Sequence, residues 1–120
     1  MLWSIIGLPA SGRTTLFELL TLQGSSGKAA GGLEVASICV PDHRVDRLAE
    51  VFQPKKVTPA EVRFTDTAGR VGKGGAAFAE FQRADGLIIC LRNFDFGFGE
   101  PDPAADLEKL SGELILFDLG

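Results

Sequence analysis

The sequence predicts an α/β fold built on a mostly parallel sheet, in a single domain. Short apolar segments typical of buried strands alternate with segments whose apolar residues recur at helical spacing. Such alternation is typical of a parallel sheet covered by helices. The length of 120 residues is enough for one domain with its own core. A glycine-containing turn between the first strand and the first helix is the third observation, and it also points to function.

The expected elements follow one another in a regular order. Pro59 indicates an edge or a bend in the third strand. Residues 23–32 are rich in Gly, Ser and Ala and lack periodicity, so we expect a loop there. We expect strands over residues 2–8, 35–40, 57–67 and 86–91, helices over residues 14–22, 76–84 and 104–119, and a further helix capped by Asp42 and ended by Pro54.

The expected core comes from apolar residues on these elements. Cys39 and Cys90 also lie in apolar runs, where we expect free, buried thiols of a reducing cytosol. The candidates for burial are Leu16, Phe17, Leu19 and Leu20 on the first helix and Val57, Val62 and Phe64 on the third strand. The helix after Asp42 is indicated by the helical spacing of Val45, Leu48, Ala49 and Phe52.

The composition narrows the class of protein. With 45% hydrophobic and 23% charged residues, it is that of a folded, soluble globular protein. A net charge of −4 and a pI near 4.9 argue against a general nucleic-acid binder, which carries a basic face. The basic residues between Arg44 and Lys56 alternate with acidic ones, as on a solvated face. No apolar segment approaches the ~20 residues of a membrane span. We therefore expect a cytoplasmic protein with no membrane partner.

The turn over residues 7–14 carries the strongest functional signal. It fits the phosphate-loop pattern G-x-x-x-x-G-K-[ST], except that Arg13 stands at the lysine position. It follows a strand-like run and opens a helix-like run, as the motif requires. In such a turn the backbone N–H groups and the helix N-terminus face a phosphate. The candidate nucleotide-binding residues are Gly7, Pro9, Ala10, Ser11, Gly12, Arg13, Thr14 and Thr15.

A second motif strengthens this interpretation. Residues 62–69 form an apolar strand that ends in D-x-x-G, with Asp66 and Gly69 as its fixed members. In phosphate-loop NTPases an aspartate at this strand end reaches the magnesium shell, and the glycine N–H meets the γ-phosphate. Thr14 would supply the hydroxyl ligand to the same metal. The pair of motifs predicts a site for Mg²⁺ with a nucleoside triphosphate.

Three blocks of the sequence carry a resemblance to a known family. They are Gly-Leu-Pro at 7–9 with Gly12 and Thr-Leu-Phe at 15–17, Val-Pro-Asp-His-Arg-Val-Asp-Arg-Leu-Ala-Glu at 40–50 with Pro-Lys-Lys-Val at 54–57, and Glu-Leu-Ile-Leu-Phe-Asp-Leu at 113–119. In these blocks the chain resembles the Obg-like ATPase family of the YchF type. The resemblance implies a three-layer, Ras-like phosphate-loop NTPase fold, incomplete, with one antiparallel strand, and residues 1–120 as a single partial nucleotide-binding (G) domain. It also implies ATP or GTP as ligand and a ribosome-associated role in the cytosol.

The chain departs from the family pattern at positions that matter for catalysis. Arg13 keeps the positive charge, but its planar fork does not fit a site shaped for an ammonium group. Ala10 replaces the family's asparagine, and Arg70 follows Gly69 where the family has a hydrophobic residue. No threonine occurs between Thr21 and Thr58 to sense the γ-phosphate. Arg13 and Arg70 are the candidate catalytic residues, although Arg70 also fits a plain surface role.

Two functions therefore stay open at the level of sequence. One is a nucleotide-binding domain whose Mg²⁺-dependent hydrolysis is weak or lost. The other is a non-enzymatic pseudo-GTPase interaction module, with the ribosome as a partner by family analogy.

The strand at 86–91 suggests a further partner. In a Ras-like sheet this strand is internal, so its outer edge would be unpaired here and would invite self-association through Leu87, Ile88 and Ile89. Alternatively, the last helix covers that edge, and the chain then stays a monomer.

Overall fold

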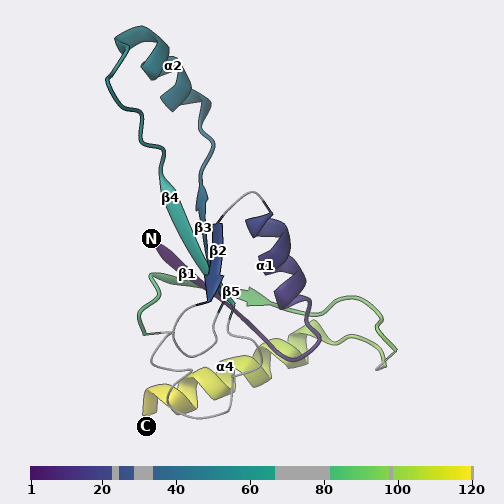
Figure 1. The fold of residues 1–120 in the computed structure, drawn as a ribbon. Coiled ribbons are helices and arrows are strands. Elements are labelled where there is room, and N and C mark those ends of the chain that lie inside the picture. Colours follow the sequence, from purple (N-terminus) through teal and green to yellow (C-terminus); the bar gives the residue numbers. More distant parts are fainter. Residues whose placement is uncertain (23–24, 29–33, 67–81, 98, 120) are drawn as a thin grey trace.

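The computed structural model describes residues 1–22, 25–28, 34–66, 82–97 and 99–119 and has the α/β architecture that the sequence predicts (Figure 1). The helix expected over 76–84 falls largely outside these residues. In chain order the elements are β1 (Leu2–Gly7), α1 (Arg13–Thr21), β2 (Ser25–Lys28), β3 (Glu34–Cys39), α2 (His43–Phe52), β4 (Glu61–Asp66), β5 (Gly86–Cys90) and α4 (Pro103–Leu119).

The sheet is mostly parallel and has the strand order β2-β3-β4-β1-β5. β1 pairs in parallel with β4 on one side and β5 on the other, whereas β3 is antiparallel to both of its neighbours. Ile5 of β1 stands opposite Asp66 of β4 and Ile88 of β5. Because β4, β1 and β5 run in one direction, their carboxyl ends meet at one edge of the sheet, where ligands bind in open α/β sheets.

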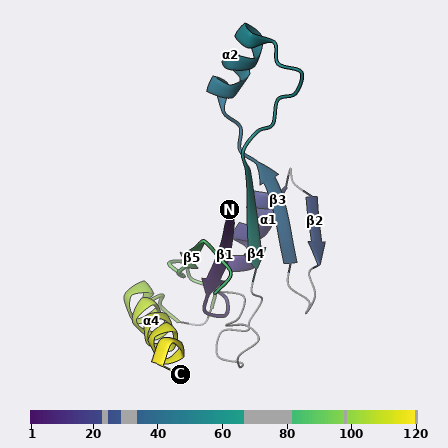
Figure 2. The ribbon, with the colours of Figure 1, turned by 90° about the vertical axis from the view of Figure 1, so that its left-hand side faces the viewer.

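Helices cover both faces of the sheet, which gives three layers (Figure 2). Successive strand residues point to opposite faces, so neighbouring residues of β1 serve two cores. Ile5 packs with Phe17 of α1 and with Phe64 of β4, all of them buried. Ile6 packs with Leu110 of α4 on the other face, and both are fully buried. β1 therefore anchors both helical layers.

One residue of α1 was wrongly assigned to the core. Leu19 is 62% exposed, whereas Phe17 is buried and Leu16 and Leu20 pack against the core. At about 100° per residue, Leu19 lies roughly 200° around the helix from Phe17 and so faces away from the sheet. The apolar run on α1 is longer than the stripe that the sheet can cover.

The edge of the sheet also differs from the sequence prediction. Residues 25–28 form strand β2, paired with β3, within the segment that we expected to be a loop. Backbone pairing to an adjacent edge does not depend on apolar side chains, which explains why periodicity missed it. β4 begins only at Glu61, after Pro59, which cannot donate to a sheet ladder. Val57 lies outside the strand and is 46% exposed, so its predicted burial was wrong.

α2 lies in the connection between β3 and β4 and projects away from the sheet (Figure 1). Its predicted cap is confirmed: the Arg44 N–H donates to the Asp42 side chain over 2.9 Å. Its apolar face is not part of the described core, since Leu48 and Phe52 are exposed. The radius of gyration of 17.5 Å exceeds the ~14 Å of a compact domain of this length, as expected for a projecting arm.

The two thiols differ from each other in burial. Cys39 is exposed, so its predicted burial was wrong, while Cys90 is half-buried and its thiol donates to the Ser11 carbonyl over 3.3 Å. Cys39 ends β3 where the chain leaves the sheet toward α2, which explains its exposure. Within the described ranges, no helix is long and apolar enough to cross a membrane.

The packing of α4 can be tested with a matched pair of leucines. Leu110→Ala should lower the free energy of unfolding by about 2–5 kcal/mol, because it opens a cavity against Ile6. Leu116→Ala, at a position that is 70% exposed on the same helix, should change it by no more than about 0.5 kcal/mol. Urea unfolding followed by circular dichroism measures both. Equal losses would show that α4 does not pack through Leu110.

Candidate functional site

The turn between β1 and α1 needs its two motif glycines for different reasons. Gly12 has φ of 85°, a left-handed conformation that glycine adopts without steric cost. At Gly7 a Cβ atom would lie 2.5 Å from Ser11 Oγ and 2.7 Å from the Cys90 carbonyl oxygen. The first glycine thus permits a close approach of the turn to β5, and the second permits the entry into α1. The motif spacing therefore corresponds to a real constraint on the backbone.

Ala10 adopts a conformation that its side chain disfavours. Its φ is 62°, in the left-handed region, which costs a residue with a Cβ atom roughly 1–2 kcal/mol. Asparagine tolerates this region better, which gives a backbone reason for the asparagine that the YchF-type resemblance places here. The turn must hold Ala10 in place by its other contacts.

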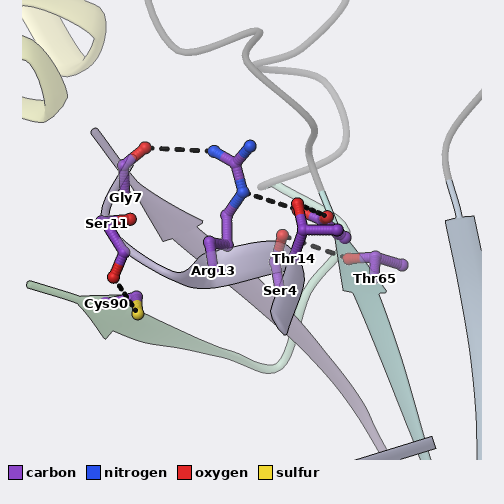
Figure 3. A network of polar contacts seen from close by, with 8 residues as sticks. Ser4, Gly7, Ser11, Arg13, Thr14, Thr65 and Cys90 are labelled. Atoms are coloured by element: carbon purple, nitrogen blue, oxygen red, sulfur yellow. Dashed lines mark hydrogen bonds and ion pairs between the residues drawn. The ribbon is translucent and has the colours of Figure 1, made fainter. Parts of the chain in front are cut away.

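Arg13 turns back into the protein and does not extend into solvent (Figure 3). Its Nη1 donates to the Gly7 carbonyl over 3.1 Å. Its Nε lies 2.6 Å from Asp66 Oδ1, with side chains that are 9% and 2% exposed. The Thr14 hydroxyl donates to the other carboxylate oxygen, Oδ2, over 2.9 Å. Two consecutive residues of α1 therefore hold both oxygens of the carboxylate that ends β4.

Two weaker polar contacts lie next to this network and connect further strands to it. The Thr65 hydroxyl donates to Ser4 Oγ over 3.2 Å and joins β4 to β1 (Figure 3). The Cys90 thiol ties β5 to the turn through the Ser11 carbonyl. Ser4 and Ser11 are both buried, so each of these part-buried contacts has one end in the protein interior. The turn is thus fastened to β1, β4 and β5 together.

The turn lines an open hollow of about 310 Å³ whose opposite wall is aromatic. Phe94 and Phe96 follow β5 and meet edge-to-face, with ring centroids 6.2 Å apart and an interplanar angle of 84°. A Cβ atom on Gly12 would lie 3.6 Å from the Phe94 ring, so this ring stands directly beside the turn. Sequence analysis missed both rings. The available signal was Phe-x-Phe just beyond a strand whose carboxyl end meets the same edge of the sheet.

The structure brings together most of the residues that the sequence nominated. Pro9 lies beside a neighbouring hollow toward α4, lined also by Arg92 and Lys109. Gly69 and Arg70 lie outside the described residues, so their expected roles stay predictions. Gly7 lies in the turn, close to Ser11. The hollow is lined by Ala10, Ser11, Gly12, Arg13, Thr14 and Thr15.

Comparison with known proteins identifies the relatives of this fold and turn. No family model matches the chain. It is 34% identical to the ribosome-binding ATPase YchF of Haemophilus ducreyi and 32% identical to that of Bacillus subtilis, over 96% of this chain and 36% of each relative. The solved structure of the Schizosaccharomyces pombe YchF GTPase superposes with a TM-score of 0.74 at 26% identity, over 98% of this chain and 36% of that one. The chain is a relative of the YchF-type, Obg-like ATPases.

The YchF relationship confirms the phosphate-loop NTPase fold that the sequence predicted. The chain is also 31% identical to the Obg-like ATPase 1 of Schizosaccharomyces pombe, over 95% of its length. It spans about a third of the length of these curated relatives. The likeness therefore extends over nearly all of this chain and over a minority of each YchF protein.

The expected metal ligands of this YchF-like turn fit Mg²⁺ only in part. Thr14 and Asp66 offer the oxygen atoms that Mg²⁺ prefers, and the structure brings them together. The Arg13 guanidinium is on the same carboxylate, and its positive charge opposes a second cation there. While Arg13 contacts Asp66, the residues present do not fit a divalent ion. In the described ranges, no group of three or more His, Cys, Asp or Glu residues offers another metal site.

The buried ion pair makes Asp66 a sensitive position for stability. Asp66→Asn should lower the free energy of unfolding by about 3–5 kcal/mol, because it leaves the buried guanidinium without a counter-charge. Asp46→Asn on the exposed surface of α2 is the control and should change it by no more than about 0.5 kcal/mol. Chemical denaturation measures both. A loss at Asp66 as small as that at Asp46 would show that the pair does not form in solution.

Proposed function

We propose that the chain is a purine-nucleotide-binding domain for ATP or GTP whose hydrolysis is weak or lost. The observation that carries the proposal is the hollow between the β1–α1 turn and the Phe94–Phe96 pair, at the carboxyl edge of the parallel strands. Pockets of this kind, largely apolar with a few convergent polar groups, suit small-molecule ligands. The names of the relatives, ATPase and GTPase, agree with this ligand class.

The parts of the hollow suit different parts of a nucleotide. The backbone around Gly7 and Gly12 and the N-terminus of α1 present N–H groups and a positive end of a helix dipole to phosphates. Phe94 and Phe96 offer flat apolar surfaces on which a purine can stack. Gly69, by its place in the D-x-x-G motif, would donate its N–H to the γ-phosphate.

Weak hydrolysis follows from the contacts of Arg13. Phosphoryl transfer is accelerated by placing positive charge at the transferring group. Here the guanidinium is drawn toward Asp66 and the Gly7 carbonyl, and Thr14 and Asp66 are bonded to each other. The residues that would hold Mg²⁺ and the cation that would meet the phosphates thus satisfy one another. Arg70 is the other candidate to stabilise charge on the phosphates.

The alternative is an interaction module that keeps the fold and has lost the ligand. The same internal ion pair favours it, because the cation of the turn already has a counter-charge within the protein. A ribosomal partner agrees with the printed names of the relatives, and the exposed arm around α2 carries Arg44, Arg47, Lys55 and Lys56 for such a contact. Either function places the protein in the cytoplasm.

Calorimetric titration with ATP, GTP, ADP and GDP tests the proposal directly. We expect saturable binding of at least one purine nucleotide, and Phe94→Ala should weaken it roughly tenfold, since aromatic stacking on a base contributes about 1–3 kcal/mol. Phe52→Ala, at an exposed position on α2, is the matched control and should leave binding unchanged. No heat and no thermal shift at millimolar nucleotide would reject this function in favour of the interaction module.

The same preparation allows hydrolysis to be compared with an Arg13→Lys variant. Phosphate release by the natural chain should be slow, and the variant should release phosphate faster, because a compact ammonium group fits between phosphates better than the guanidinium fork. Unchanged release would place the catalytic defect outside Arg13.

We also propose that the chain associates with itself through the outer edge of β5. Among the described strands β5 pairs only with β1, and its residues Leu87 and Ile89 are 37% and 40% exposed. Ile88 packs against the core, so its contribution would be through its backbone. Light scattering should show a molar mass that rises with concentration. A constant monomeric mass at high concentration would contradict the edge contact.

A further inference from the structure

The carboxylate expected to hold Mg²⁺ already has a positive partner within the protein. Arg13 Nε lies 2.6 Å from Asp66 Oδ1, and both side chains are largely shielded from water. A buried carboxylate must be paired or coordinated, and either a guanidinium or a metal ion satisfies it. In this chain the guanidinium does so, and it is covalently part of the turn.

The second expected ligand is occupied in the same way. The Thr14 hydroxyl donates its proton to Asp66 Oδ2 over 2.9 Å. A metal ion between the two residues would have to break this hydrogen bond and also move Arg13 away from the carboxylate. Mg²⁺ demands strict geometry and gives up its water ligands reluctantly, so it is poorly suited to compete for such a site.

Arg13 can serve a phosphate without leaving Asp66. The residue lines the hollow beside the turn and begins α1. A guanidinium has five N–H donors, and the contacts with Asp66 and with the Gly7 carbonyl engage Nε and one Nη1 N–H. Planar guanidinium forks bind phosphates through paired hydrogen bonds. The hydrogen-bond donors that a phosphate needs are therefore supplied by the chain itself.

We propose that the Arg13 guanidinium replaces the divalent cation in this site, so that the chain binds purine nucleotide without Mg²⁺. This inference rests on the proposed nucleotide binding and adds that its affinity does not depend on the metal. It also separates binding from hydrolysis, because phosphoryl transfer uses a metal that binding does not need.

The test is a pair of calorimetric titrations of the natural chain with ADP, one in excess MgCl₂ and one in excess EDTA at equal ionic strength. The two dissociation constants should agree within about threefold. A dissociation constant that rises by more than that in EDTA overturns the inference while leaving nucleotide binding intact. Absence of binding in both buffers rejects the proposed function, and with it the inference.

Two variants decide whether Arg13 is the cause. Arg13→Lys, checked for folding by circular dichroism, should bind ADP at least about tenfold more weakly in EDTA than in Mg²⁺, because an ammonium group cannot hold Asp66 and a phosphate through the same fork. Arg44→Lys, on the exposed arm, should keep the metal independence of the natural chain. If a folded Arg13→Lys protein is also indifferent to Mg²⁺, the guanidinium is not the replacement. If the variant does not fold, the titrations of the natural chain still decide the proposal.

Discussion

The ion pair between Arg13 and Asp66 is the interaction on which the functional edge of this molecule depends. It joins the start of α1 to the end of β4, and the bond from Arg13 to the Gly7 carbonyl adds the end of β1. Each of the two charges would be costly in the interior without the other. Because each charge requires the other, the pair holds the turn between β1 and α1 in place. The hollow that the turn lines is held in place with it. The position of α1 against Ile5 and Phe64 follows from the same anchor.

Arginine stands at the lysine position of the motif, and its positive charge is directed at Asp66. Lysine and arginine are both cations, but a guanidinium carries donors in a planar fork and pairs readily with a carboxylate. In this chain the fork faces Asp66 and the backbone of the turn. The YchF-like fold is retained, while the positive charge of Arg13 is balanced by a carboxylate of the protein itself. The shape of the turn thus depends on its glycines and on the Arg13–Asp66 pair together.

In the arm around α2, the formation of the helix and the packing of its apolar face have different causes. The Asp42 cap and the Gln53 N–H bond to the Ala49 carbonyl define the two ends of the helix from residues within and next to it. Its apolar residues form a stripe, and Val45, Leu48 and Phe52 line a shallow hollow with the segment that follows them. Among the described residues, this stripe does not join either core of the sheet. The amphipathic pattern therefore predicts that a helix forms. It does not predict which surface covers the apolar face of that helix.

The sequence by itself determined the class of fold, nearly all of its elements and the residues of the turn, because these follow from short-range causes. Glycine freedom at Gly12, the cap at Asp42 and the apolar run of β1 act over a few residues. Only the tertiary structure decided the strand at 25–28, the exposure of Leu19, Val57 and Cys39, and the aromatic wall of Phe94 and Phe96. It also decided where Arg13 points. That choice depends on Asp66, which is far away along the chain and reaches the turn only because β1 and β4 pair side by side in the sheet.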